Sequence, residues 1–182
     1  MSDHESIEKD KKAVMNVYGL FGASILLSVI PHAGAALLSL IFLTVLLIMA
    51  YVNRKRAEDK SLLHNHSVFV IKTIWVTGLI AFGTMVAASG YIFAFIDYLP
   101  FSPCAEGIMD NAMAISENND IDLFMLHAQP CLSSFIDANY NTLMISGVIG
   151  IAPPFVYIAY RFIKGAGRAV KGYRIAEPDS WL

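Results

Sequence analysis

The chain has 182 residues, of which 56% are hydrophobic and 15% are charged, and its formal net charge at pH 7 is −2. Soluble domains carry about 25% charged residues, so this composition excludes an ordinary soluble fold. The slightly negative charge argues against nucleic acid as a partner. Lys, Arg, Asp and Glu are absent from three stretches, Ala13–Val52, Thr73–Ile96 and Ala138–Tyr160. Each stretch is long enough for a membrane-spanning helix, which needs about 20 residues.

Four membrane-spanning helices are predicted. The first charge-free stretch accommodates two of them, Val14–Ile30 and Ala36–Val52, because Pro31-His32-Ala33-Gly34 interrupts it with residues that break helices. The third predicted helix is Lys72–Tyr98 and the fourth is Asn141–Phe162. The chain is therefore expected to be an all-α integral membrane protein.

The distribution of positive charge predicts the orientation. All 13 Lys and Arg residues lie before the first helix, between the second and third, at the start of the third, or from the end of the fourth onward. Because Lys and Arg accumulate on the cytoplasmic side, both termini are predicted to be cytoplasmic. The predicted segments are a cytoplasmic N-terminal segment (1–13), a transmembrane hairpin (14–52), a cytoplasmic basic loop (53–71), transmembrane helix three (72–98), an outer cap (99–140), transmembrane helix four (141–162) and a cytoplasmic amphipathic tail (163–182).

The outer cap holds the only two cysteines of the chain, Cys104 and Cys131. An oxidising compartment favours a disulfide between them, which would stabilise the fold by roughly 3.5 kcal/mol through chain entropy. Pro103 and Pro130 each precede a cysteine and predict chain turns rather than helix interiors. The short helices predicted between the two prolines are Ala105–Ile115 and Ile121–Ala128.

Small residues mark two of the predicted spans. Gly19 and Gly22 lie in the first, and Gly83 and Ala87 lie in the third. Small residues let helices approach closely in lipid, where apolar contact alone does not drive association. They are predicted to pack the four helices together, and the alternative is docking onto another membrane subunit.

Pro153 and Pro154 interrupt the fourth predicted span. Two consecutive prolines remove two amide donors, so carbonyls near Ile149 and Gly150 lose their helical partners. Within hydrocarbon these carbonyls must be met by protein or water. A packed kink is predicted, and the alternative is a broken helix lining a substrate path, as in transporters.

From the end of the fourth span onward, basic residues recur every three or four positions and form one stripe on a helix: Arg161, Lys164, Arg168 and Lys171. Together with Trp181, this stripe predicts contact with anionic lipid headgroups or with a partner protein.

Two segments resemble a family of proteins. The sequence His66-Ser67-Val68-Phe69-Val70-Ile71-Lys72-Thr73-Ile74-Trp75, together with Tyr160-Arg161-Phe162-Ile163-Lys164-Gly165, resembles small uncharacterised bacterial membrane proteins related to the Tic20-like group. The resemblance implies a bacterial cytoplasmic (inner) membrane, so that the loop 98–140 would be periplasmic. It implies no catalytic residues.

These features predict a non-enzymatic protein that acts as a subunit or accessory scaffold of a larger inner-membrane complex. Its expected partners are other membrane-protein subunits and anionic phospholipid at the cytoplasmic face, and no catalytic, cofactor-binding or metal site is predicted. The alternative is a small oligomeric channel or transporter in which the fourth helix, kinked at Pro153 and Pro154, lines the path.

Overall fold

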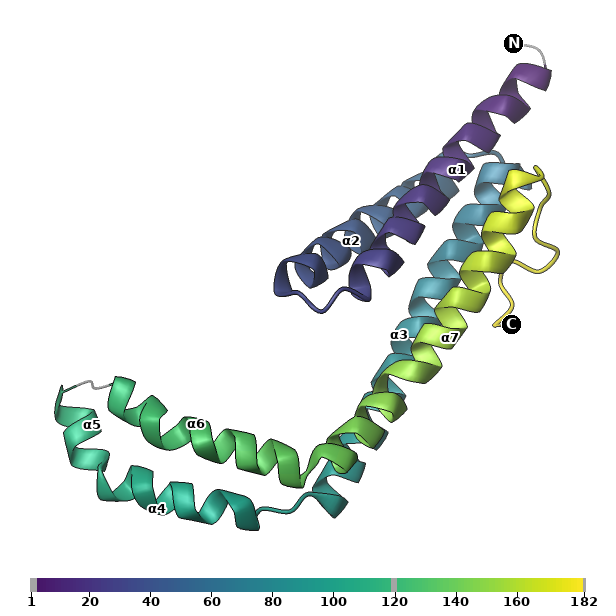
Figure 1. The fold of residues 1–182 in the computed structure, drawn as a ribbon. Helices are drawn as coiled ribbons and strands as arrows, with labels where there is room; N and C mark the ends of the chain where they lie inside the picture. Colours follow the sequence, from purple (N-terminus) through teal and green to yellow (C-terminus); the bar gives the residue numbers. More distant parts are fainter. Residues whose placement is uncertain (1–2, 119–120, 182) are drawn as a thin grey trace. The chain divides into compact units, whose positions relative to one another are not determined.

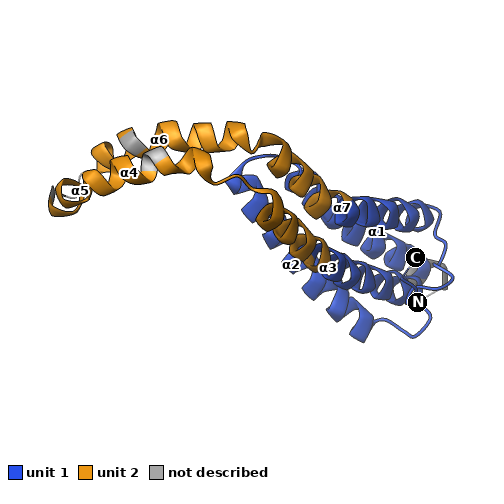
Figure 2. Ribbon diagram, turned by 90° about the horizontal axis from the view of Figure 1, so that it is seen from below, with its two compact units in different colours: residues 1–81, 153–182 blue, residues 82–152 orange. Residues whose placement is uncertain are grey.

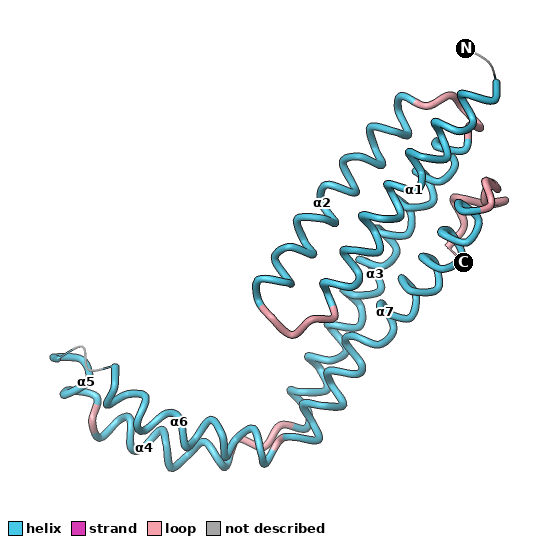
Figure 3. Tube along the Cα trace, turned by 45° about the horizontal axis from the view of Figure 1, so that its top comes forward, coloured by secondary structure: helices cyan, strands magenta, loops and turns pink. Residues whose placement is uncertain are grey.

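The computed structural model describes the backbone of residues 3–118 and 121–181, and all of their side chains except those at 3–6, 103, 104, 118 and 127. Every regular element in these ranges is a helix (Figures 1 and 3), which confirms the all-α prediction. In chain order the elements are α1 (Asp3–Ser28), α2 (Ala33–Arg56), α3 (Leu62–Phe95), the 3-10 helix η1 (Leu99–Phe101), α4 (Ser102–Asp110), α5 (Ala112–Asn118), α6 (Ile121–Ala138) and α7 (Tyr140–Val170).

Three described helices, α2, α3 and α7, are long and apolar enough to cross a membrane. They contain the second and fourth predicted spans in full and the third as far as Phe95, three residues before its predicted end at Tyr98. The first predicted span lies in α1, which is not among the three because charged residues occupy its first part and leave only Ala13–Ser28 free of charge. A fourth span therefore stays a prediction.

The chain forms two compact units (Figure 2), and each is described by itself. Unit 1 comprises residues 1–81 and 153–182, and unit 2 comprises residues 82–152. Unit 1 therefore holds α1, α2, the first part of α3, the last part of α7 and the C-terminal tail. Unit 2 holds the remainder of α3 and α7 together with η1, α4, α5 and α6.

The core of unit 1 is built on a helical hairpin. On α1 the buried residues recur at the helical spacing expected for one apolar face, and they pack with buried residues of α2, α3 and α7. The cluster consists of Val14, Val17, Tyr18, Phe21, Leu46, Ala50, Val70, Ile71 and Ala169. Two buried serines also join α1 to α2: Ser24 donates to the carbonyl of Ser39 (3.1 Å), and Ser39 donates to the carbonyl of Ser24 (2.9 Å).

The connection between α2 and α3 is shorter than expected. Most of the predicted basic loop 53–71 is helical, because α2 continues to Arg56 and α3 begins at Leu62. Ser61 caps α3: its hydroxyl accepts a hydrogen bond from the backbone N–H of His64 at 3.1 Å. Ten residues of α3 therefore precede the predicted start at Lys72.

Unit 2 is organised by Asn139, which is buried between α6 and α7. Its side chain accepts from the backbone N–H of Asp97 (2.7 Å) and donates to the carbonyl of Asp97 (2.8 Å). These two bonds join the end of α3 to the start of α7. Phe101 of η1 and Phe135 of α6 stack edge to face, with ring centroids 6.0 Å apart.

The structure corrects the prediction of a turn at Pro130, which lies inside α6. A proline frees the carbonyl four residues earlier, here that of Leu126. Both residues are exposed, so the free carbonyl need not be buried without a partner. Helix α6 consequently runs to Ala138 rather than ending at Ala128.

The first predicted cap helix, Ala105–Ile115, is divided into α4 and α5 at Asn111. The Asn111 side chain donates to the carbonyl of Gly107 at 2.9 Å, and such a local bond competes with helix continuation. Helices α4 and α6 pack against each other, and Cys131 is buried in α6. The side chain of Cys104 is outside the described part, so its pairing with Cys131 stays a prediction.

Candidate functional site

The most unusual polar group of unit 1 is the guanidinium of Arg161 in α7, which is 0% exposed. Its Nε donates to Thr73 Oγ1 at 3.1 Å, and its Cζ lies 3.7 Å from the centre of the Phe69 ring. The two terminal nitrogens, Nη1 and Nη2, are buried and make no hydrogen bond to any described residue. Two of the three donor-bearing nitrogens of a permanently charged side chain are therefore unused.

Helix α3 presents both contacts of Arg161 from one face. Phe69 and Thr73 are four positions apart, so they lie one above the other on the helix. The Thr73 hydroxyl donates to the carbonyl of Phe69 at 2.7 Å. With its proton directed there, the hydroxyl oxygen is oriented to accept from Arg161.

One helical turn before Phe69, His66 connects α1, α3 and the C-terminal tail. Tyr18 Oη lies 2.9 Å from His66 Nδ1, and His66 Nε2 lies 3.0 Å from the carbonyl of Tyr173. A carbonyl can only accept, so Nε2 carries the proton, and Nδ1 of the neutral ring accepts from the Tyr18 hydroxyl. Gly165 of α7 lies directly against the Tyr18 ring, at a distance that leaves no room for a Cβ atom.

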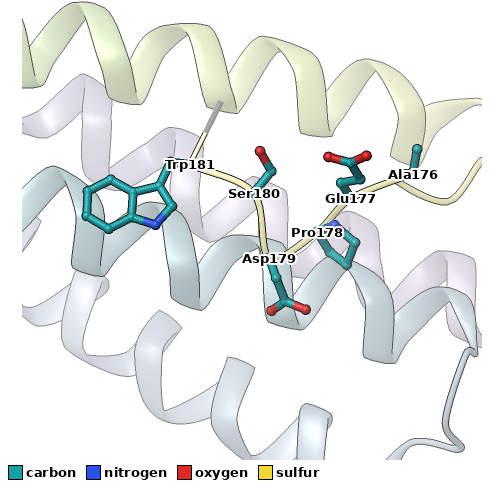
Figure 4. A pocket seen from close by; sticks show the side chains of 6 residues that line it. All are labelled: Ala176, Glu177, Pro178, Asp179, Ser180 and Trp181. Carbon is teal, nitrogen blue, oxygen red and sulfur yellow. The ribbon is translucent and has the colours of Figure 1, made fainter.

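The C-terminal tail docks back onto α3 and α7. Asn65 makes two hydrogen bonds to the backbone of Ile175, donating to its carbonyl (2.9 Å) and accepting from its N–H (2.7 Å). Tyr157 donates to the carbonyl of Trp181 at 2.8 Å, and Lys72 Nζ lies 5.2 Å from the centre of the Trp181 ring. Tail residues Ala176–Trp181 line an open groove (Figure 4).

The structure corrects the predicted basic stripe at one position. Arg161 is buried within unit 1 and does not lie on an exposed, lipid-facing stripe, because Phe69 and Thr73 of α3 enclose it. Arg168 and Lys171 are exposed, and Lys164 is half-buried with its Nζ 5.5 Å from the Tyr160 ring centre.

Of the four small residues predicted to pack helices, only Gly22 is in close contact with another helix. A Cβ added there would lie 3.0 Å from Cζ of Phe162 in α7. A Cβ added at Gly19 or Gly83 would have no described atom within 4 Å, and Ala87 is exposed. Most of these positions are therefore open on the surface of the described chain.

Helix α7 continues through Pro153 and Pro154. The carbonyl of Gly150, which would normally accept from residue 154, instead accepts from the Thr84 hydroxyl at 2.9 Å. A Cβ added at Gly150 would lie 3.5 Å from Sδ of Met85. These contacts favour the packed arrangement over a carbonyl lining an open path.

The sequence interpretation missed Tyr18, Asn65 and His66 as members of a site. It placed His66 in a loop, whereas His66, Phe69 and Thr73 follow one another at helical spacing. That spacing begins before Lys72 and was the available signal for an earlier start of α3. Phe69, Thr73 and Arg161, which meet in the structure, all belong to the two segments that carry the family resemblance.

The described chain thus defines a class: all-helical proteins with several apolar helices long enough to cross a membrane. Comparison with protein-family models, curated proteins and solved structures gives no match. The resemblance to the Tic20-like group accordingly stays a prediction.

Proposed function

We propose that the protein is a non-enzymatic subunit or accessory scaffold of a larger complex in the bacterial inner membrane. In this proposal the chain crosses the membrane four times with both termini in the cytoplasm. Unit 2 carries a periplasmic cap that a Cys104–Cys131 disulfide closes. Other membrane-protein subunits are its principal partners, and Lys164, Arg168 and Lys171 contact anionic phospholipid headgroups.

The observation that carries the proposal is an open small-residue face on α3. Gly83, Ala87 and Gly90 follow one another at helical spacing and therefore share one face. All three are exposed, and a Cβ added at either glycine would have no described atom within 4 Å. Small residues in apolar helices allow another helix to approach closely. This face is free to receive a helix of a partner subunit.

The candidate spans leave ample surface for such contacts. In the most apolar 18-residue segments (windows) of α2, α3 and α7, 17%, 33% and 11% of the segment is buried inside the protein. At least two thirds of each window is therefore left for lipid or for other subunits.

Charge supports the proposed orientation. All 13 Lys and Arg residues belong to unit 1, and the charged residues of unit 2 are all acidic.

Within unit 1, Asp10 near the start of α1 accepts from the backbone N–H of Leu63 at the start of α3 (3.3 Å). Because α1 and α3 begin at the same end, the α1–α2 hairpin returns the chain to the side from which it started. This geometry supports α1 as the additional span.

The alternative function, a channel or transporter, needs polar groups of α7 along an open path. The hydrogen bond from Thr84 occupies the carbonyl of Gly150 that Pro154 leaves without a helical partner. This observation favours the scaffold function.

Affinity purification of the full chain from native membranes in mild detergent, with mass spectrometry of co-purifying proteins, tests the proposal. We expect a defined partner set with the wild type and its loss in Gly83→Ile. Gly78→Ile is the matched control: Gly78 lies on the same helix, is also open, and is five positions and roughly 140° away around the axis. A wild-type chain that purifies alone, or equal partner recovery from both variants, would contradict the proposal.

A further inference from the structure

The buried guanidinium of Arg161 has no anionic partner within the described chain. It forms no ion pair with any described carboxylate, and Nη1 and Nη2 have no described hydrogen-bond acceptor. An arginine side chain stays protonated in proteins, so the charge persists although it is buried. Buried charges are normally paired or hydrogen-bonded, since an unpaired one is strongly destabilising.

We propose that Arg161 binds one phosphate group, in a site formed with Phe69 and Thr73 of α3. The anion site does not depend on the scaffold function, but the choice of a lipid source rests on the membrane orientation proposed above. The Nε atom of Arg161 donates to the Thr73 hydroxyl, and the Phe69 ring covers one face of the guanidinium plane. The two terminal nitrogens remain as a planar pair of donors, a geometry that fits two oxygens of one phosphate.

The basic residues next to Thr73 and Arg161 in the sequence favour an anionic ligand. Lys72 directly precedes Thr73, and Lys164 follows Arg161 by about one helical turn. Their ammonium groups lie beside aromatic rings of Trp181 and Tyr160, at 5.2 and 5.5 Å from the ring centres. No acidic residue lies within the segment from 138 to 176, so α7 itself adds no repulsion toward an anion.

Two sources can supply the phosphate, a phospholipid headgroup or free phosphate. Arg161 is the first charged residue after the charge-free stretch Ala138–Tyr160, which places it at headgroup depth in the proposed orientation. The tail residues that line the groove are connected to the site by Tyr157, which donates to the carbonyl of Trp181 and whose ring centre lies 6.0 Å from Arg161 Cζ. Glu177 and Asp179 line that groove (Figure 4) and repel free anions. The depth of Arg161 and the acidic residues of the groove therefore favour a lipid phosphodiester that approaches from the bilayer over free phosphate that enters through the groove.

The first test uses only the wild-type chain. Full-length protein is purified in detergent and washed until its phosphorus content is constant, and native mass spectrometry then identifies retained molecules. One phospholipid per chain supports the lipid source. A rise in melting temperature with millimolar inorganic phosphate, but not with sodium chloride of equal ionic strength, supports free phosphate. A chain that retains no phosphorus and shows no such rise would overturn the proposal.

Variants then locate the site. Arg161→Gln removes the charge and is expected to weaken phosphate or lipid binding by about tenfold or more, as for the loss of charged hydrogen bonds. Arg56→Gln is the matched control, because Arg56 is an exposed arginine at the end of α2, away from the residues assigned to the site. Equal binding by folded Arg161→Gln and the wild type would overturn the assignment to Arg161. If Arg161→Gln does not fold, Thr73→Val is measured in its place. It keeps the charge of Arg161 but removes the Nε contact and the Thr73 bond to the Phe69 carbonyl, and unchanged binding there would contradict the site.

Discussion

Replacing Gly165 by alanine tests the close approach of α7 to α1. The Cβ atom of an alanine would collide with the Tyr18 hydroxyl and would lie 2.8 Å from both Cε1 and Cζ of that ring. The ring cannot move freely, because it is buried and its hydroxyl is hydrogen-bonded to His66. We therefore expect Gly165→Ala to force the two helices apart and to break the bond to His66.

The size of the effect follows from three contributions. Overpacking costs about 1–3 kcal/mol, and loss of the bond between Tyr18 and His66 costs about 0.5–1.5 kcal/mol. Alanine returns about 1 kcal/mol through its higher helix propensity. The matched control is Gly167→Ala, because a Cβ at Gly167 would have no described atom within 4 Å. Since both variants gain the same propensity, Gly165→Ala should be about 1.5–4.5 kcal/mol less stable than Gly167→Ala.

The assay is reversible unfolding of the full chain in mixed micelles with increasing sodium dodecyl sulfate, followed by circular dichroism. A second variant, Tyr18→Phe combined with Gly165→Ala, removes the nearest colliding atom and should recover part of the loss. Equal stability of Gly165→Ala and Gly167→Ala would refute the packing of Tyr18 against Gly165.

Two further variants test other hydrogen bonds. Thr84→Val should destabilise the protein by about 1–3 kcal/mol, because it leaves the carbonyl of Gly150 unpaired. The control Thr77→Val removes only a bond within its own helix and should have little effect in the same unfolding assay. Asn139→Ala removes both bonds to the backbone of Asp97 and should accelerate hydrogen exchange at the Asp97 amide, while helix content stays unchanged. Wild-type exchange at Asp97 in this variant would contradict the bridging role of Asn139.

Hydropathy was sufficient to predict the apolar helices, because the absence of charge over about 20 residues is a strong constraint in a bilayer. Residues Thr73–Phe95 of the first stretch lie within α3, and Tyr140–Tyr160 of the second lie within α7. The same criterion placed the start of α3 too late. It treats charged and polar residues as loop, whereas Ser61 caps a helix that continues through His64, Asn65 and His66.

The cap was less predictable. A proline usually ends a helix because it frees a carbonyl, but at Pro130 the affected residues are exposed and the helix continues. At the division, the Asn111 side chain bonds to the carbonyl of Gly107, and helical spacing in the sequence carries no information about that bond.

The Arg161 site could be predicted only in part. Its residues stand in two segments 88 positions apart, and a stripe of basic residues every three or four positions normally lies on a helix surface. Which member of the stripe faces inward depends on the packing of α7 against α3. It also depends on contacts of α7 with α1, such as Gly22 with Phe162 and Gly165 with Tyr18, which are pairings between distant residues rather than local patterns.

The proposed topology is tested most directly by determining on which side of the membrane the end of α2 and the cap lie. In a Cys104→Ser/Cys131→Ser background, one cysteine is introduced at Arg54, the exposed end of α2, or at Glu117, exposed in the cap. Cells are then treated with a membrane-impermeant maleimide. We predict labelling of Glu117→Cys in spheroplasts and of Arg54→Cys only after the inner membrane is permeabilised. Labelling of both positions in intact spheroplasts, or of neither, would contradict the proposed topology and the functional assignments that depend on it.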